Sequence, residues 1–230
     1  MSLSRNPGRV VGFWYLLLCF IGPLRLIYIP NKLFVDGDAA ATVRNILAHE
    51  WLFQLGIVSS LAIGVLWIFL ILAFYRLFEG VDRNLAVQVV IFGGVMPCTL
   101  FFVNAMFDAG ALMVAHGVDF LSVFSKPQQD ALVVLLLSLQ HHQNTAAEVL
   151  WGVWLIPLAL LVYRSRFIPR WLGVWLFIDG LANLNMSMTG VLFPQYQDKV
   201  FLYSQPALFG ELGLMLWLLI KGARPPGMES

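Results

Sequence analysis

The chain has 230 residues, of which 60% are hydrophobic and only 12% are charged, and its formal net charge is +1. About a quarter of the residues of a soluble domain are charged, so this composition excludes an ordinary soluble domain and indicates a membrane protein. The small net charge excludes the basic surface on which nucleic-acid binding depends. The sequence contains none of the common phosphate-binding, dinucleotide-binding, zinc-protease or serine-hydrolase motifs.

Six apolar stretches follow one another along the chain, and each has roughly the 20 residues that a helix needs to cross a bilayer. They lie at 10–28, 51–75, 85–107, 145–163, 171–189 and 200–220. Because no sequence is left for a soluble domain, we predict one all-α domain over residues 1–230, a polytopic membrane helix bundle of about six transmembrane helices. The first stretch is too long, and too closely followed by the next, for a cleaved signal peptide.

The basic residues predict the orientation of the bundle. Nine Lys and Arg residues lie on the side that holds both termini, and five lie on the other side, namely Arg25, Lys32, Arg44, Lys126 and Lys199. Cytoplasmic loops of membrane proteins are enriched in such residues. We therefore predict a multi-pass protein with its N- and C-termini in the cytoplasm.

Two connections on the outer side are predicted to carry helical extensions. Asp38 is a suitable N-cap after the turn at 31–37, and the helix that it begins is expected to run without a break into the second span. Residues 128–163 would form a helix of about 54 Å, much longer than the bilayer core of about 30 Å. We expect the polar cluster at 140–144 to divide this segment into an outer helical piece, 130–139, and a span. Cys19 and Cys98 are interpreted as small apolar residues within spans.

Several polar and ionisable side chains fall within the apolar stretches. Such a group costs at least about 2.5 kcal/mol on insertion scales, and membrane proteins that retain several of them generally use them. Glu211 and Asp179 lie deepest, whereas the others lie in the outer halves of their spans. This distribution predicts a cavity that is open to the outer leaflet or the outer face, with carboxyl groups along its wall and floor. The alternative for each group is a hydrogen bond that fixes the packing of two helices.

Four of these residues are candidate catalytic groups: Glu148, Glu211, His141 and Glu50. Desolvation favours the protonated form of a carboxyl group, which suits a general acid, and a histidine or a better solvated carboxylate can then serve as the base. His141 and Glu148 lie seven residues apart, on one face of a helix. The candidate substrate-binding residues are Asn104, Asp108, Asn144, Trp151, Asp179 and Asn183.

Four blocks of sequence resemble a known family. They are GDAAATVRNI at 37–46, LFQLGIVSSL at 52–61, WGVWLIPLALLVYRSRFIPRWLGV at 151–174 and GELGLMLWLLIKG at 210–222. Together they are similar to the bacterial integral-membrane proteins of domain-of-unknown-function family 4386. The resemblance implies six spans and the bacterial cytoplasmic membrane, without an established activity. The chain departs from the family pattern at Gln54 and Ser60, and its Glu148 and Asp179 stand where uncharged residues are expected.

These features support a leading hypothesis and two alternatives. The first is an intramembrane enzyme without a cofactor, namely a hydrolase, cyclase or isomerase. Its reaction would be hydrolysis, epoxide opening, cyclisation or isomerisation. Its substrate would be a hydrophobic small molecule, of lipid, terpenoid or polyketide type, that enters from the bilayer. The second is a small-molecule or proton-coupled transporter or a membrane accessory protein. The third is a metal or haem site built from histidines and carboxylates. Besides the lipid membrane and that substrate no partner is predicted, nucleic acid is excluded, and no oligomeric state is predicted.

Overall fold

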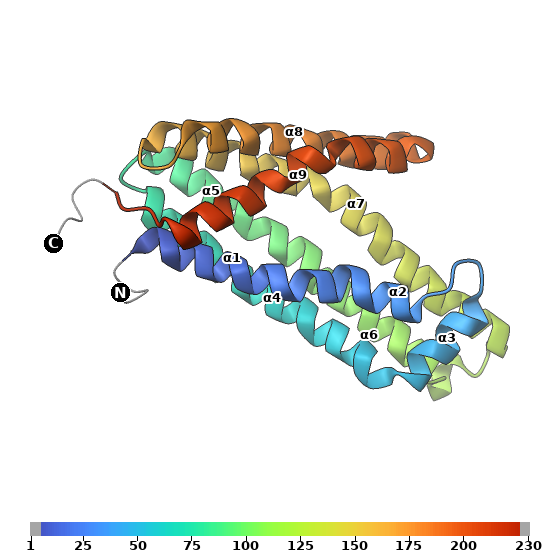
Figure 1. Ribbon diagram of the computed structural model, residues 1–230. Coiled ribbons are helices and arrows are strands. Elements are labelled where there is room, and N and C mark those ends of the chain that lie inside the picture. Colours follow the sequence, from blue (N-terminus) through green and yellow to red (C-terminus); the bar gives the residue numbers. More distant parts are fainter. Residues whose placement is uncertain (1–5, 226–230) are drawn as a thin grey trace. The chain divides into compact units, whose positions relative to one another are not determined.

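Helices make up the secondary structure of this chain. The computed structural model describes residues 6–225, apart from the side chains of 97–99, and within this part of the chain there is no strand. Arg5, one of the nine basic residues on the side that holds both termini, therefore lies outside the described residues, and so does the side chain of Cys98. The helices are α1 (Pro7–Pro23), η2 (Leu24–Tyr28), α2 (Ile29–Leu33), α3 (Ala39–Ala48), α4 (Glu50–Phe78), α5 (Arg83–Pro97), η3 (Cys98–Phe102), α6 (Val103–Ala115), η4 (Asp119–Leu121), α7 (Lys126–Ser165), α8 (Arg170–Leu192), η5 (Pro194–Tyr196) and α9 (Gln197–Ile220) (Figure 1).

Within the described residues, four helical stretches are long and apolar enough to cross a membrane. They are Pro7–Leu33, Glu50–Phe78, Arg83–Ala115 and Lys126–Ser165. The prediction of an all-helical chain is thereby confirmed for this part of the chain, and these four stretches have the length and composition of membrane spans. Helices α8 and α9 have 23 and 24 residues, but polar side chains such as Asp179 and Glu211 interrupt their apolar sequence. The count of six spans and the orientation of the termini stay predictions.

Two prolines precede local changes of helix type. The π-helical segments η2 and η3 directly follow Pro23 and Pro97. A proline inside a helix removes one backbone hydrogen bond and clashes with the preceding turn, so the chain relaxes into a wider turn nearby. A π-helical segment thus follows Pro97, and an equivalent one after Pro23 contains Arg25.

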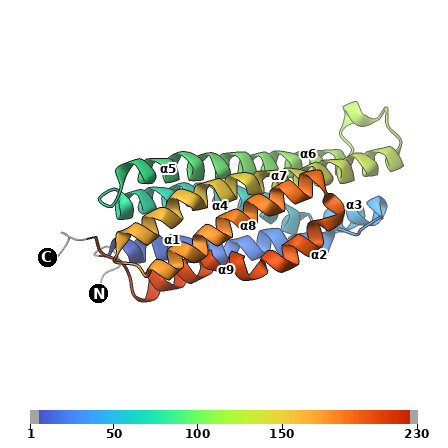
Figure 2. The ribbon, with the colours of Figure 1, turned by 90° about the horizontal axis from the view of Figure 1, so that it is seen from above.

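The chain divides into two compact units, each made of sequence-distant segments. One, here called unit 1, comprises Met1–Leu18, Leu66–Pro97 and Thr145–Ser230, and the other, unit 2, comprises Cys19–Val65 and Cys98–Asn144. Unit 1 has an aromatic core in which Trp154, Phe74 and Phe78 are fully buried, with Trp67 packed edge-on against Trp154. Helices α8 and α9 lie side by side in this unit, as Figure 2 shows.

The core of unit 2 forms where α2, α3, α4, α6 and α7 meet. Its centre contains Leu33, Ile46, Phe53, Ala111 and Val133, all of them nearly inaccessible to solvent. Burial of such side chains contributes about 1.5–3 kcal/mol each and holds α3 against the longer helices. The unit therefore has a core of its own, and its polar groups are positioned by this packing.

Hydrogen bonds from α3 fix the loop at 34–38. Asp38 caps α3, as predicted, by accepting a hydrogen bond of 2.8 Å from the backbone N–H of Ala41. The Thr42 hydroxyl accepts from the backbone N–H of Val35, and the Asn45 amide donates to the carbonyl of Leu33. Three hydrogen bonds thus fix the loop and the adjacent end of α2 to α3, which shapes the wall of a pocket in this unit.

Two boundary predictions were wrong. Helix α3 does not continue into the second span, because His49 leaves the helical conformation with φ −126° and ψ 42°, and α4 begins at Glu50. Helix α7 is not divided at 140–144 but runs unbroken for 40 residues, or about 60 Å at 1.5 Å per residue. The polar cluster satisfies its groups by side-chain contacts and exposure, which leaves the backbone of α7 intact.

Candidate functional site

A pocket of about 700 Å³ lies within unit 2. Residues of η2 and α2, the loop at 34–38, the start of α3 and the part of α7 between Ala131 and Asn144 line it. Its apolar wall comes from Leu26, Pro30, Phe34, Val134 and Leu137. Its polar side chains include Arg25, Gln140, His141, His142 and Asn144. This combination of an apolar wall with a few convergent polar groups is typical of small-molecule sites, as is the volume.

Arg25 is a buried charge at this pocket, where it belongs to a hydrogen-bonded network with three neighbouring side chains. Its Nη2 donates to Asp108 Oδ2 at 2.5 Å and its Nε donates to the Ser60 hydroxyl at 2.7 Å. The same Asp108 oxygen accepts a hydrogen bond of 3.2 Å from Gln140. Arg25 and Asp108 are 5% and 2% exposed, so the pair replaces water for both ions. A buried charge needs such a partner, because an unpaired one costs several kcal/mol.

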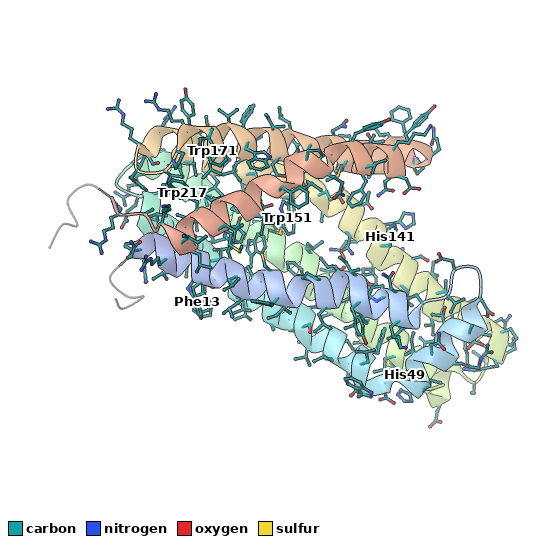
Figure 3. The ribbon with its side chains drawn as sticks, viewed as in Figure 1. Phe13, His49, His141, Trp151, Trp171 and Trp217 are labelled. Carbon is teal, nitrogen blue, oxygen red and sulfur yellow. The ribbon has the colours of Figure 1, made fainter. Side chains whose placement is uncertain are left out.

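Two adjacent histidines of α7 face the same pocket. The rings of His141 and His142 are 5.9 Å apart and perpendicular, and His141 is labelled in Figure 3. Nδ1 of His142 lies 2.8 Å from the backbone carbonyl of Ser138. A carbonyl only accepts, so Nδ1 carries the proton and the lone pair of a neutral His142 is at Nε2. His142 therefore has the tautomer of a general base.

Asn104 and Asn144 are joined directly. The Asn104 amide donates to Asn144 Oδ1 at 2.7 Å, and Asn144 also lines the pocket. Asn104 is 2% exposed, and with Asp108 it forms the polar face of α6 toward α7. Of the predicted substrate-binding residues of unit 2, Asn144 lines the pocket, whereas Asn104 and Asp108 lie behind its lining and contact it through Asn144, Arg25 and Gln140.

Glu50 lies elsewhere in unit 2. Its carboxylate accepts a hydrogen bond of 2.7 Å from Gln54 and lies 3.3 Å from Nε2 of His116. Glu50 is not among the residues that line the pocket. Glu50 thus lies beside His116 and away from His141, and its catalytic role stays a prediction.

Unit 1 contains a second polar cluster, around Glu211 on α9. Tyr15 of α1 donates its hydroxyl to Glu211 Oε2 at 2.7 Å, and the indole N–H of Trp151 on α7 donates to Oε1 at 2.5 Å. Trp151 is labelled in Figure 3. Both carboxylate oxygens thus have partners, and Glu211 connects three helices.

Asp179 lies beside this group and is completely buried. Its Oδ1 accepts a hydrogen bond of 2.9 Å from Asn183, one helical turn further along α8. Its other oxygen faces the α9 backbone, since a Cβ at Gly210 would be only 3.2 Å from Oδ2. The carboxyl groups of Asp179 and Glu211 are close enough to interact electrostatically.

Glu148 is the least satisfied carboxyl group of this unit. Its Oε2 is buried and has no hydrogen-bond partner among the described residues. Glu148 precedes Trp151 by three residues on α7, so both point toward the same side of that helix. Glu148 and Glu211 both belong to unit 1, and their catalytic roles stay predictions.

The predicted site residues therefore fall into separate groups. Glu148, Trp151, Asp179, Asn183 and Glu211 belong to unit 1, and the remaining five, Glu50, Asn104, Asp108, His141 and Asn144, belong to unit 2. Sequence reasoning assigned no functional role to Arg25, Ser60, Gln140 or Tyr15. The sequence analysis used Arg25 only as a basic residue of the outer side. Arg25 is, however, an ionisable residue within an apolar stretch, which is the feature that identified Glu211 as a candidate.

A metal centre receives no support from this arrangement. Among the residues that the structure describes, no three or more His, Cys, Asp and Glu side chains are grouped as metal ligands. Cys19 is exposed on α1, and Nδ1 of His49 lies 3.2 Å from the backbone carbonyl of Asn45.

Comparison with known proteins gives a family and little chemistry. A profile of the family described as Domain of unknown function (DUF4386) matches residues 10–222. An uncharacterized protein of Archaeoglobus fulgidus is 32% identical over 76 residues, which are 33% of this chain and 44% of that protein. The chain thus matches less than half the length of this relative. No solved structure matches.

Proposed function

The chain belongs to the family described as Domain of unknown function (DUF4386), and we propose that it is a membrane enzyme performing acid/base chemistry on a hydrophobic small molecule. The pocket of unit 2 carries this proposal, because it combines an apolar wall with two histidines in about 700 Å³. Such a volume suits a molecule of ordinary metabolite or lipid-fragment size. The helices around it are apolar enough to lie in a bilayer, from which the substrate would enter.

The histidines supply the chemistry in this proposal. Nε2 of His142 removes a proton from water or from an acidic carbon of the substrate, and the carbonyl of Ser138 holds the resulting imidazolium by its Nδ1–H. The proton then returns to the leaving or rearranged group, directly or through His141. Acid/base groups of this kind contribute about 10²- to 10⁴-fold to a rate. Hydrolysis, epoxide opening, cyclisation and isomerisation are reactions that can proceed with acid/base groups alone.

The test compares two histidines of similar local structure. The ring Nδ1 of both His142 and His49 contacts the carbonyl four residues earlier, but only His142 lines the pocket. The purified full chain would be assayed on p-nitrophenyl dodecanoate and on an epoxidised fatty acid. We expect His142→Gln to lower kcat/KM by about 100-fold or more, and His49→Gln to leave it unchanged. Equal activity of the wild type and His142→Gln would refute the role of the histidine.

The carboxyl cluster of unit 1 favours proton-coupled transport as a second candidate. Glu211 and Asp179 interact, and Glu148 has a buried oxygen without a partner, which is the chemistry of proton relays. A transporter must open its substrate site to both faces in turn. A single cysteine at Ser138, introduced in a chain without Cys19 and Cys98, would then react with a membrane-impermeant maleimide from either side of oriented vesicles. Reaction from one side alone would contradict transport.

A further inference from the structure

The pocket of unit 2 contains a hydrogen-bond donor that does not donate to the neighbouring side chains. Of the Arg25 guanidinium, Nε donates to Ser60 and Nη2 donates to Asp108, whereas Nη1 has no hydrogen-bond partner among the described residues. Nη1 is also not one of the fully buried unpartnered atoms of this part of the chain. Arg25 itself is among the residues that line the pocket.

Arg25 is held rigidly enough to recognise a ligand. The ion pair with Asp108 and the bond to Ser60 fix two edges of the planar guanidinium, and Gln140 in turn holds Asp108. A guanidinium in a fixed orientation suits carboxylate or phosphate oxygens, and its hydrogen bonds to them are stronger than neutral ones. Asp108 balances the charge of Arg25 but does not line the pocket, so it makes no direct contact with a ligand there.

The rest of the pocket favours an apolar body attached to such an oxyanion. Leu26, Pro30, Phe34 and Val134 give it an apolar wall, which suits a hydrocarbon chain. The amides of Gln140 and Asn144 supply further polar contacts near the head. The two acidic residues of the pocket, Asp36 and Asp38, belong to the α2–α3 connection, where Asp38 is occupied by the cap of α3.

We infer that the pocket of unit 2 binds an amphiphile whose oxyanion head, a carboxylate or a phosphate, accepts hydrogen bonds from Arg25 while its chain lies along the apolar wall. This inference rests on the proposed function, because it names the class of molecule that the same pocket takes. It assigns Arg25 the task of orienting the substrate and leaves proton transfer to the histidines.

Three probes with the same chain length test the head group. Binding of dodecanoate, dodecyl phosphate and 1-dodecanol to the full chain in dodecyl maltoside would be followed with radiolabelled probes by equilibrium dialysis. We expect at least one of the two anions to bind about ten-fold or more tightly than the alcohol. A preference for dodecanoate identifies a fatty-acid type of ligand, and a preference for dodecyl phosphate a lipid-phosphate type.

Variants separate recognition by Arg25 from a general effect on folding. Removing both members of the buried pair, Arg25→Gln with Asp108→Asn, leaves no unpaired ion, and we expect it to abolish the preference for the anions. Val134→Trp fills the apolar wall without touching the ion pair and is expected to abolish binding of all three probes. Val123→Trp, at a residue that is 80% exposed and does not line the pocket, is the matched control and should bind as the wild type does.

The outcomes distinguish this inference from the proposal on which it rests. Equal binding of the alcohol and the anions by the wild type, or an anion preference that survives in the double variant, would overturn the inference and leave the proposed function standing. Binding of all three probes that is unchanged in Val134→Trp would show that the pocket is not the binding site, and both would then fail. An anion preference that is kept in His142→Gln, together with loss of turnover, supports both.

Discussion

The ion pair between Arg25 and Asp108 is predicted to be the strongest single coupling within unit 2. Each charge is almost fully buried, at 5% and 3% side-chain exposure, and their contact is 2.5 Å. Removing one member of such a pair leaves the other ion without a counter-charge, which costs about 3–5 kcal/mol. We therefore expect Arg25→Gln and Asp108→Asn each to lower the free energy of unfolding by an amount in this range.

The double variant carries the decisive information. With both charges removed there is no unpaired ion, so the loss should be smaller than the sum of the two single losses by about 2 kcal/mol or more. The residual loss comes from the hydrogen bonds that Ser60 and Gln140 make to the pair. A double-mutant cycle isolates this coupling because the loss of side-chain volume in Arg25→Gln occurs in both the single and the double variant and cancels, while Asn has the same shape as Asp.

The assay uses the chain's own chromophores and a built-in comparison. The eight tryptophans allow unfolding by SDS, from detergent micelles, to be followed by fluorescence. The pair Arg164–Asp82 has a similar contact, 2.7 Å, but its side chains are 55% and 27% exposed. Its coupling should stay below about 1 kcal/mol because solvent screens it. Additive losses at Arg25 and Asp108, or equal couplings for the two pairs, would refute the reasoning.

Three further predictions concern local packing. Tyr15→Phe removes the hydroxyl that donates to Glu211 at 2.7 Å and should cost about 1–3 kcal/mol of unfolding free energy, measured in the same titration. Gly152→Ala places a Cβ 2.6 Å from a carbonyl oxygen of α8 and should lower Tm by several degrees, while Gly94→Ala, with nothing within 4 Å, should not. Asp38→Ala removes the cap of α3 and should cost about 1 kcal/mol, and no loss of α3 protection in hydrogen exchange would contradict that role.

Much of the architecture could be predicted from composition and spacing. The helical membrane class, the four most apolar spans and the cap at Asp38 follow from residue type and from the length that a bilayer requires. The break at His49 and the continuity of α7 could not be predicted, because both depend on packing against other helices. A polar cluster along a helix lowers its apolar character without opening its backbone.

The site was predictable in its residue types more than in its grouping. Asn104, Asp108 and Asn144 were singled out because polar groups are costly in spans; Asn144 lines the pocket, while Asn104 and Asp108 contact residues of its lining. Arg25 was missed because a basic residue near the end of a span is usually a surface charge. The bond from His142 to Ser138, which sets its tautomer, depends on a ring orientation that sequence does not specify.

The most direct test of the account is photoaffinity labelling of the pocket of unit 2. A dodecanoate that bears a diazirine on its chain would be irradiated with the full chain in lipid nanodiscs, and the labelled peptides mapped by mass spectrometry. The account predicts labelling concentrated in the loop at 34–38 and in α7 between Ala131 and Asn144, and its loss in Val134→Trp. Labelling spread over the exposed apolar faces of the helices, unchanged in that variant, would contradict it.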